Sequence, residues 1–223
     1  MELKIHKLKE KGVRKPTIFQ LNIPKINILG FFVTKKLTRK LKKLINNLNY
    51  FSKFIAYVPI MTGCNNFCAF CVVPFTRGRE ISRPSRKIIW EVKNLIKRNF
   101  KEIWLLGQNV NSYYDPEEKI NFSQLLKKIN EIPGNFWIRF TSSHPKDFSK
   151  GIIDVIAMGE KITEYLNLPV QSGDNEILKK MNRPYTIEEY KDIIKEIRKK
   201  IPEICLSTDI IAVSYTHLTL PTN

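Results

Sequence analysis

Short apolar runs alternate with helical patterns from about residue 53 to residue 211. Five of the runs have the length and the content of Ile, Leu and Val that are typical of buried parallel strands. They occupy residues 55–61, 102–108, 136–142, 165–171 and 203–211. Because helical patterns fit between them, this order predicts a parallel α/β sheet, either open or curled toward a barrel.

The helical patterns occupy residues 84–100, 122–132, 148–158 and 187–200. The first begins with Pro84 and Ser85, which favour a helix start, and it repeats apolar side chains on one face. Those side chains are Ile88, Ile89, Val92, Leu95 and Ile96. We expect this helix to cross over the sheet with its apolar face inward.

An N-terminal extension and a short tail flank this region. Residues 1–52 are rich in lysine, and residues 34–51 place leucines at helical spacing. We expect a basic amphipathic helix there, which either packs on the next domain or binds a partner, and packing is the simpler interpretation. Residues 212–223 end in VSYTHLTLPTN, which resembles a translated sequencing adaptor. We therefore expect a core domain at residues 53–211, a tail that is not native, and a chain that is a fragment.

The charge of the chain favours a polyanionic partner. Lys and Arg number 38 against 21 Asp and Glu, which gives a net charge of +17 and a pI near 9.7, and clustered cations neutralise phosphates. An AT-rich genome produces a similar excess of lysine, so the charge alone is a weak indication. The sequence contains neither an apolar run of about 18 residues nor a signal-peptide core, so we expect a cytoplasmic protein without membrane contact.

Three of the four cysteines lie close together, as Cys64, Cys68 and Cys71. In a reducing compartment such spacing indicates a metal or redox site more than disulfides. Structural zinc needs four ligands, and the remaining Cys205 is predicted to be a buried apolar residue of a strand. Three thiolates can instead hold three irons of a [4Fe-4S] cluster and leave the fourth open. The loop follows the first strand, at the end where α/β proteins place active sites.

Polar side chains also follow the ends of later predicted strands. Gln108 and Asn109 end the second, Ser143 and His144 follow the third, and Gln171 ends the fourth. Because parallel strands end at one edge of a sheet, these residues are candidates for contacts to a cofactor or a substrate. The alternative is local: Asn109 and Ser143 cap loops, and His144 satisfies a turn.

The sequence around the cysteines resembles the radical S-adenosylmethionine (radical SAM) enzymes. It shares their spacing C-x3-C-x2-C and an aromatic residue before the last cysteine, here Phe70. The resemblance implies that SAM binds the open iron and that an electron from the cluster cleaves it to a 5′-deoxyadenosyl radical. It also implies that Cys64, Cys68 and Cys71 are the catalytic cluster ligands, and that Phe70 lies along the adenine of SAM.

Four longer stretches resemble one family of these enzymes, the methylthiotransferases. They are GCNNFCAFCVVPFTRGREISRPS, LLGQNVNSY, IRFTSSHP and LPVQSGDNEILKKMNRPYT, within residues 53–211. The similarity is greatest to the bacterial branch that converts N6-isopentenyladenosine at position 37 of tRNA to its 2-methylthio form. It implies a partial parallel (β/α) radical SAM barrel, at whose mouth we expect Gln108, Asn109, Ser143 and Gln171 to contact the cofactor.

The same resemblance implies a tRNA substrate and an electron donor of the flavodoxin or ferredoxin type. Four arginines after the cysteines are expected to contact the tRNA backbone, because Arg pairs well with phosphate, although surface ion pairing is the alternative. They are Arg77, Arg79, Arg83 and Arg86. Complete members hold a second [4Fe-4S] cluster on three further cysteines, and this chain has none before Cys64.

Other functions stay open at this point. A methylthiotransferase of another branch acts on threonylcarbamoyladenosine in tRNA or on a ribosomal protein. A different class is a non-catalytic iron-sulfur or zinc module that only binds RNA, and a third possibility is a fragment that does not fold, because its sheet has an exposed edge. Nothing in the sequence indicates an oligomeric state.

Overall fold

The computed structural model describes residue 52 and residues 54–212 of the chain. They belong to one of the two units into which the chain divides, Tyr50–Asn223. The helix predicted at residues 34–51 and residues 213–223 of the predicted tail lie outside the described residues. No helix of the described part is long and apolar enough to cross a bilayer.

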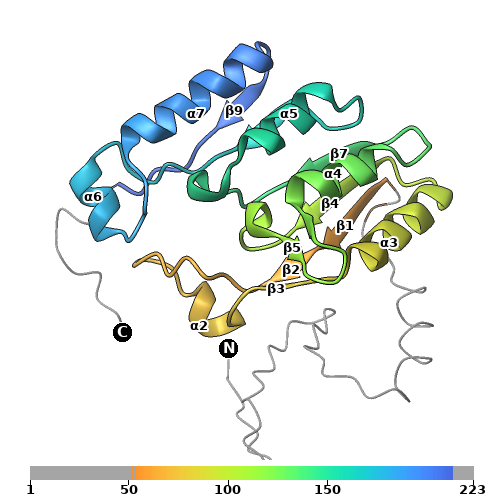
Figure 1. The fold of residues 1–223 in the computed structure, drawn as a ribbon, viewed down its shortest axis with the longest axis horizontal. Helices are drawn as coiled ribbons and strands as arrows, with labels where there is room; N and C mark the ends of the chain where they lie inside the picture. Colours follow the sequence, from red (N-terminus) through yellow and green to blue (C-terminus); the bar gives the residue numbers. More distant parts are fainter. Residues whose placement is uncertain (1–51, 53, 213–223) are drawn as a thin grey trace, which may run out of the picture. The chain divides into compact units, whose positions relative to one another are not determined.

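Five parallel strands follow one another in chain order, as the sequence predicts (Figure 1). Strands β1 (Ile55–Pro59), β4 (Glu102–Leu106) and β7 (Trp137–Phe140) form a three-stranded sheet in that order. Strands β8 (Tyr165–Asn167) and β9 (Cys205–Ser207) form a separate parallel pair. The α/β fold class is therefore confirmed.

A single parallel bridge connects the two groups of strands. Ile138 of β7 bridges to Ile162, which lies ahead of β8. Ile138 N donates to Lys161 O at 2.7 Å, and Thr163 N donates to Ile138 O at 3.1 Å. Through this bridge β8 follows β7, so the strand order runs on across both groups.

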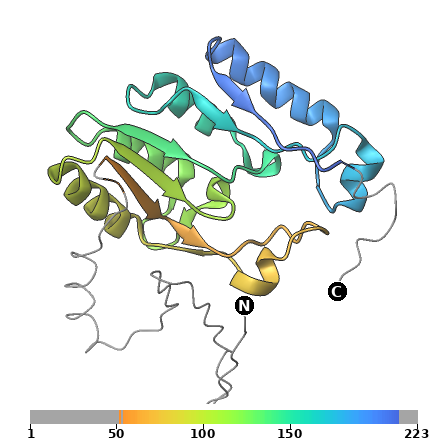
Figure 2. The ribbon, with the colours of Figure 1, turned by 180° about the vertical axis from the view of Figure 1, so that it is seen from behind.

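The four predicted helices are all present. They are α3 (Ser85–Lys97), α4 (Phe122–Asn130), α5 (Lys150–Met158) and α7 (Ile187–Lys200), and each lies within the segment predicted for it. Each follows a strand and precedes the next parallel one, which is the right-handed crossover pattern of α/β proteins. In Figure 2 the strands of the three-stranded sheet lie in front and helices α3 and α4 lie behind them.

Several short elements were not predicted, because two to six residues carry too little periodicity to be recognised in a sequence. They are helices α2 (Val73–Arg77) and α6 (Asn175–Lys180), the antiparallel pairs β2 (Met61–Thr62) with β3 (Ile81–Ser82) and β5 (Tyr114–Asp115) with β6 (Ile120–Asn121), and the 3-10 turns η1 (Val110–Ser112) and η2 (Pro145–Asp147).

All five strands are shorter in the structure than the runs predicted for them, and two of them end for a visible reason. The strand predicted at residues 55–61 ends at Pro59, because Met61 leaves the parallel sheet and pairs with β3. The strand predicted at residues 165–171 ends at Asn167. Pro169 follows two residues later and has no N–H for a ladder bond.

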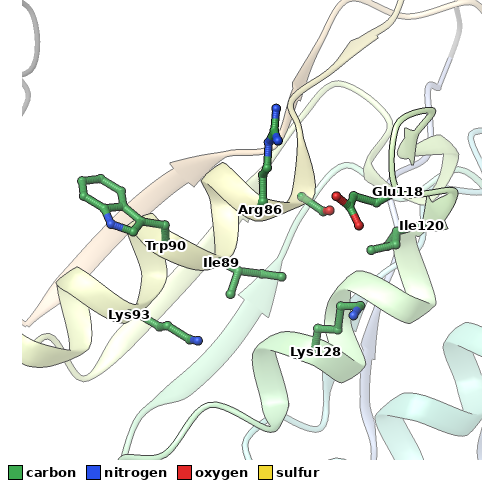
Figure 3. Close-up of a pocket in the computed structure, with 8 residues that line it drawn as sticks. Arg86, Ile89, Trp90, Lys93, Glu118, Ile120 and Lys128 are labelled. Atoms are coloured by element: carbon green, nitrogen blue, oxygen red, sulfur yellow. The ribbon is translucent and has the colours of Figure 1, made fainter.

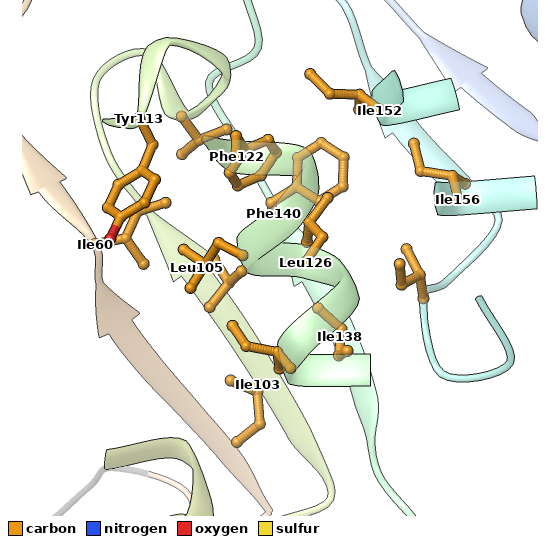
Figure 4. Packing of buried hydrophobic residues seen from close by; sticks show 14 of the residues in the cluster. Ile60, Ile103, Leu105, Tyr113, Phe122, Leu126, Ile138, Phe140, Ile152 and Ile156 are labelled. Atoms are coloured by element: carbon orange, nitrogen blue, oxygen red, sulfur yellow. The ribbon is translucent and has the colours of Figure 1, made fainter. Parts of the chain in front are cut away.

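One face of the three-stranded sheet forms the core with α3, α4 and α5. Alternate strand residues, among them Ile103, Leu105 and Ile138, are fully buried against these helices (Figure 4). Phe122 of α4 packs edge to face on Phe140 of β7, with ring centroids 5.2 Å apart. The apolar residues that repeat at helical spacing in the helices and at alternate positions in the strands therefore meet at one interface.

The other face of the sheet carries aromatic and charged side chains. Tyr57, Trp104 and Arg139 stand on it at neighbouring register positions. Trp104 Nε1 donates to Glu102 Oε1 at 2.6 Å, and Arg139 Nε lies 2.8 Å from the same oxygen. Tyr57 remains exposed within the described residues. A sheet with helices on one face and polar groups on the other fits a partial barrel, whose strands face outward to helices and inward to a polar lumen.

Cys205 corrects one prediction. It lies in a strand, β9, but its side chain is exposed rather than buried. Among the described strands β9 pairs with β8 alone, so it is an edge strand, and Cys205 stands at its first residue. An apolar run at a sheet edge lacks a second neighbour to bury it.

The loop after β4 fixes the start of α3. The buried Asp115 accepts hydrogen bonds from Ser85 N at 2.7 Å and Glu117 N at 3.0 Å. Tyr113 Oη donates to Arg83 O at 2.7 Å. Burial raises the pKa of Asp115, but the hydrogen bonds from Ser85 and the following loop lower it more, so the pKa lies below its usual value. Because Ser85 is the first residue of α3, Asp115 caps this helix from a distant segment.

The variant Asp115→Asn is expected to lower the free energy of unfolding by about 1–2 kcal/mol at pH 7. The folded pKa lies below the unfolded value of about 3.9, so the stabilisation is complete above that value and is lost as the pH falls through the folded pKa. Urea unfolding at pH 7 and near pH 3 should show the gap between wild type and variant narrowing in acid. Glu118→Gln, in the same loop, is the control, and an equal loss there would contradict the assignment.

Candidate functional site

The cysteine loop, residues 63–72, follows β1 and β2 at the carboxyl end of the first parallel strand. It begins with Gly63, whose φ is +78° and whose position leaves no room for a side chain, since a Cβ would lie 2.1 Å from Arg79 O. Cys64 N donates to Gly78 O at 3.2 Å. Backbone approach of residues 78–79 therefore closes the turn that sets the loop's direction.

The three predicted cysteines are on this loop, Cys64 and Cys68 buried and Cys71 partly buried. Cys71 N donates to Cys68 O at 2.9 Å. Burial raises the pKa of the Cys64 thiol, and the nearby Glu80, Cys68 and Cys71 add to this rise, while the backbone at Asn66 opposes it. The three thiols therefore lie on one short segment that is largely buried.

The three thiols are the kind of ligand that an iron-sulfur cluster takes. In the described part of the chain no three or more His, Cys, Asp or Glu side chains are arranged to hold one metal ion. Three ligands of a [4Fe-4S] cluster each bind a different iron, so their sulfurs need not converge on one point. A loop with three thiols, two of them buried, provides the donor set that such a cluster needs.

Residues 181–183, which are distant in sequence, contact the cysteine loop. Ala69 N donates to Met181 O at 2.9 Å, and Asn182 Nδ2 donates to Phe67 O at 2.9 Å. The Nη1 group of Arg183 lies 3.6 Å from the sulfur of Cys68. Three consecutive residues of the motif MNRPYT therefore contact three consecutive residues of the loop.

Gln108 and Asn109, predicted cofactor contacts at the end of β4, make different bonds. Gln108 Oε1 accepts a hydrogen bond from Gly63 N at 2.7 Å, so this side chain holds the start of the cysteine loop. Asn109 is 1% exposed and donates from Nδ2 to Asp147 Oδ2 at 2.7 Å. Its Oδ1 has no partner among the described residues.

Ser143 and His144 follow β7 and are both buried. His144 N donates to Asn111 Oδ1 at 2.9 Å, and Lys146 N donates to His144 Nδ1 at 3.2 Å. Burial, with Arg183 and Lys146 nearby, lowers the pKa of His144 to about 3, so the ring is neutral. Its Nε2 lies 4.0 Å from Cys68 Sγ. The alternative that His144 satisfies a turn is therefore correct in part, because its second nitrogen also faces the cysteine loop.

Three buried polar atoms at these strand ends have no hydrogen-bond partner within the described residues. They are Asn109 Oδ1, Asn111 Nδ2 and Ser143 Oγ. Unpaired buried polar atoms are costly, at about 1–3 kcal/mol each, and rare in folded proteins. A polar ligand that reaches the ends of β4 and β7 would satisfy them.

The structure does not join Phe70 and Gln171 to the rest of the predicted site. Phe70 is half buried, and no hydrogen bond or ring contact links it to the other predicted residues in the described part. Gln171 adopts a φ of +69°, which is unusual for a residue with a side chain, and its backbone pairs with Asp209 and Ile211. It lies beyond the end of β8 rather than at the last residue of the strand, and its role stays a prediction.

The four predicted arginines have separate surroundings. Arg83 is used internally: it donates to Pro59 O and lies 2.6 Å from Glu91. Arg86 pairs with Glu117 at 3.0 Å, with both side chains exposed. The Arg79 guanidinium lies over the Phe67 ring at 4.4 Å. Arg77, in the last turn of α2, is exposed.

A pocket of about 330 Å³ lies on the helix-covered side of the sheet, between α3 and α4 (Figure 3). Arg86, Lys93 and Lys128 stand around it with the exposed Trp90. None of the predicted cofactor residues lines this pocket. No residue of the cysteine loop lines it either, so this pocket is separate from the cysteine loop.

The sequence analysis missed Asn111, Asp147 and Arg183. All three lie within or beside motifs that were recognised: Asn111 in GQNVNSY, Asp147 just after SSHP, and Arg183 in MNRPYT. These residues could have been predicted as polar residues of the recognised motifs, but only their neighbours in sequence were chosen as candidates.

A parallel α/β sheet with a three-cysteine loop at its carboxyl edge defines the class of this protein. The chain belongs to the radical SAM superfamily, whose family model matches residues 58–217. Solved structures agree in fold. The chain has a TM-score of 0.57 to the cobalamin-dependent radical enzyme OxsB (12% identity, covering 78% of this chain and 25% of that one). It has a TM-score of 0.55 to the radical SAM methyltransferase TsrM from Kitasatospora setae (17% identity, 70% and 30%).

The sequence comparison narrows the similarity. The chain is 50% identical over 179 residues to the tRNA-2-methylthio-N(6)-dimethylallyladenosine synthase of Clostridium botulinum strain Hall, which covers 79% of this chain and 40% of that protein. It is 55% identical over 161 residues to the protein of the same name in Thermoanaerobacter pseudethanolicus (72% and 34%). The chain thus spans about two fifths or less of the length of the curated relatives it matches.

The variant Gly63→Ala is expected to displace the cysteine loop, because the new methyl group would meet Arg79 O and the backbone has a left-handed φ. After anaerobic reconstitution, the iron and sulfide bound per chain should fall several-fold. The control is Gly173→Ala, because a Cβ at Gly173 meets nothing within 4 Å. Equal iron content in both variants would show that the turn does not need its glycine.

Proposed function

We propose that this chain is the radical SAM part of an enzyme that methylthiolates tRNA at N6-isopentenyladenosine 37. The observation that carries the proposal is that three of the four motifs contact the cysteine loop, which lies in the remaining one. The names of the relatives support the substrate and the reaction. Because the chain spans only part of their length, the complete activity belongs to the complete protein.

In this proposal Cys64, Cys68 and Cys71 hold a [4Fe-4S] cluster at the mouth of the partial barrel. When bound, the cluster and SAM would supply the 5′-deoxyadenosyl radical that removes hydrogen from C2 of the adenine. The chain's own contribution is to orient the three sulfurs through Gln108 and residues 181–183, and to keep two of them away from water. A second cluster for sulfur insertion would come from cysteines that this chain does not contain.

The unpaired atoms of Asn109, Asn111 and Ser143 are the proposed contacts for SAM. They offer an acceptor, a donor and a hydroxyl, which complement the amino, carboxylate and ribose groups of that cofactor. Phe70 and Gln171 are proposed to lie along the adenine and at the rim of the same site. Buried, preorganised polar groups of this kind orient a cofactor at small reorganisation cost.

For the tRNA backbone we propose Arg77, Arg79 and Arg86, whose side chains lie at the surface. Arg83 is a weaker candidate, because Pro59 O and Glu91 already occupy its guanidinium. The base must leave its stack to reach the cluster, as with other enzymes that modify bases. The proposal includes a cytoplasmic location and an electron donor of the flavodoxin or ferredoxin type.

Reconstituted wild type is expected to release 5′-deoxyadenosine from SAM when reduced with dithionite, and the triple variant Cys64→Ala, Cys68→Ala, Cys71→Ala is expected to release none. Cys205→Ala is the matched control and should behave as wild type, because that thiol is exposed on β9. A wild type that binds four irons yet leaves SAM intact would indicate a non-catalytic iron-sulfur module. Binding of anticodon stem-loops carrying isopentenyladenosine or threonylcarbamoyladenosine at position 37 separates the two tRNA branches.

The variant Ser143→Ala should weaken SAM binding about five- to thirty-fold, which corresponds to one hydrogen bond of about 1–2 kcal/mol. The free energy of unfolding without SAM should stay the same or rise, because a buried unpaired hydroxyl is removed. Equilibrium binding and urea unfolding measure the two quantities. Ser149→Ala, at an exposed helix start without a side-chain cap bond, is the control. A parallel loss of stability and binding would make Ser143 structural.

A further inference from the structure

Arg183 is a buried cation without an acidic partner. Arg183 is 6% exposed, and among the described residues no carboxylate forms an ion pair with its guanidinium. Nε donates to Tyr185 Oη at 2.8 Å, and Nη2 donates to Pro169 O at 2.8 Å. Both partners are neutral. A buried charge is costly unless it is paired, so an anion is expected beside the remaining nitrogen.

That nitrogen, Nη1, faces the sulfur of Cys68 at 3.6 Å. The turn made by residues 169–185 needs only Nε and Nη2, which bind its own main chain and its own tyrosine. The third nitrogen points out of this turn toward the cysteine loop. Two nitrogens of the side chain therefore hold the turn, and the third, Nη1, is directed at the sulfur of Cys68.

A second donor, His144 in the segment that follows β7, approaches the same sulfur. His144 Nδ1 accepts the hydrogen bond from Lys146 N, so in the neutral ring the proton is on Nε2. Nε2 lies 4.0 Å from Cys68 Sγ. Tyr185 orders both groups: its ring packs edge to face on His144 at 5.8 Å and lies beneath Arg183 at 5.0 Å.

We infer that Arg183 and His144 are positioning residues that donate to the sulfur of Cys68 and thereby raise the reduction potential of the cluster held on the cysteine loop. This inference rests on the proposed function, because it requires that cluster. Hydrogen bonds and positive charge at a ligand sulfur stabilise the form with more negative charge, and this is one of the ways in which proteins set cluster potentials. Reduction adds one electron from dithionite or a protein donor, and no bond or proton needs to change.

The first variant is Arg183→Gln, which removes the charge. At a fixed ambient potential the ratio of reduced to oxidised cluster should fall about tenfold, equal to 59 mV for one electron. Redox titration of the reconstituted chain, followed by the electron paramagnetic resonance of the reduced cluster, measures this ratio. Arg183→Lys keeps the charge and should recover most of the potential. Arg198→Gln, exposed on α7, is the control.

The second pair of variants isolates His144. His144→Asn places an acceptor where Nδ1 was and keeps the bond from Lys146 N, but it removes the donor to Cys68. His144→Gln places an amide donor near the position of Nε2. The potential should fall in the Asn variant and stay near wild type in the Gln variant. A side chain that only supported the fold would not separate these two variants by potential.

The outcomes separate this inference from the proposed function. A wild type that binds no four-iron cluster would refute both. A wild type with a cluster, together with unchanged potentials in Arg183→Gln and His144→Asn, would refute this inference alone. If Arg183→Gln loses its iron, His144→Asn decides: a lower potential supports the inference, and an unchanged one overturns it.

Discussion

The cysteine loop depends on hydrogen bonds from outside itself. The hydrogen bond from Cys71 N to Cys68 O lies within the loop. The others cross to distant segments: Cys64 N donates to Gly78 O, Ala69 N donates to Met181 O, and Phe67 O accepts from the side chain of Asn182. A loop of this kind has little shape in isolation, because buried N–H and C=O groups must be paired. Its geometry is a property of the folded sheet, and the positions of the three sulfurs follow from it.

Parallel pairing makes this arrangement possible. β1, β4 and β7 run the same way in register, with Val58 beside Leu105 and Leu105 beside Phe140. Their carboxyl ends therefore meet at one edge, and segments far apart in the sequence come together there. Gln108 reaches Gly63, and His144 reaches both Asn111 and Cys68. Motifs that are separate in the sequence therefore contribute neighbouring residues to the site around the cysteine loop.

Most of the architecture was predictable, and the details of the site were not. Apolar runs and helical periods identified the five strands and four helices because burial imposes those periods. The same method misjudged Cys205, because an apolar run does not reveal whether its strand is central or at an edge. It did not predict the hydrogen bond from Gly63 N to Gln108, because that contact depends on how the cysteine loop folds back on β4. It passed over Arg183, because the direction of that side chain depends on the turn formed with Pro169 and Tyr185, which no local pattern encodes.

In the described part of the chain the parallel strands form two groups, which the bridge between Ile138 and Ile162 connects, and the cysteine loop contacts segments of both groups. The loop starts from β1, in the first group, while Met181, Asn182 and Arg183 come from the segment after β8, in the second. The contacts that position the sulfurs therefore also link the two groups of strands. A ligand that binds only the folded loop stabilises these contacts by mass action, so occupancy of the site and the stability of the link between the two groups of strands are thermodynamically coupled.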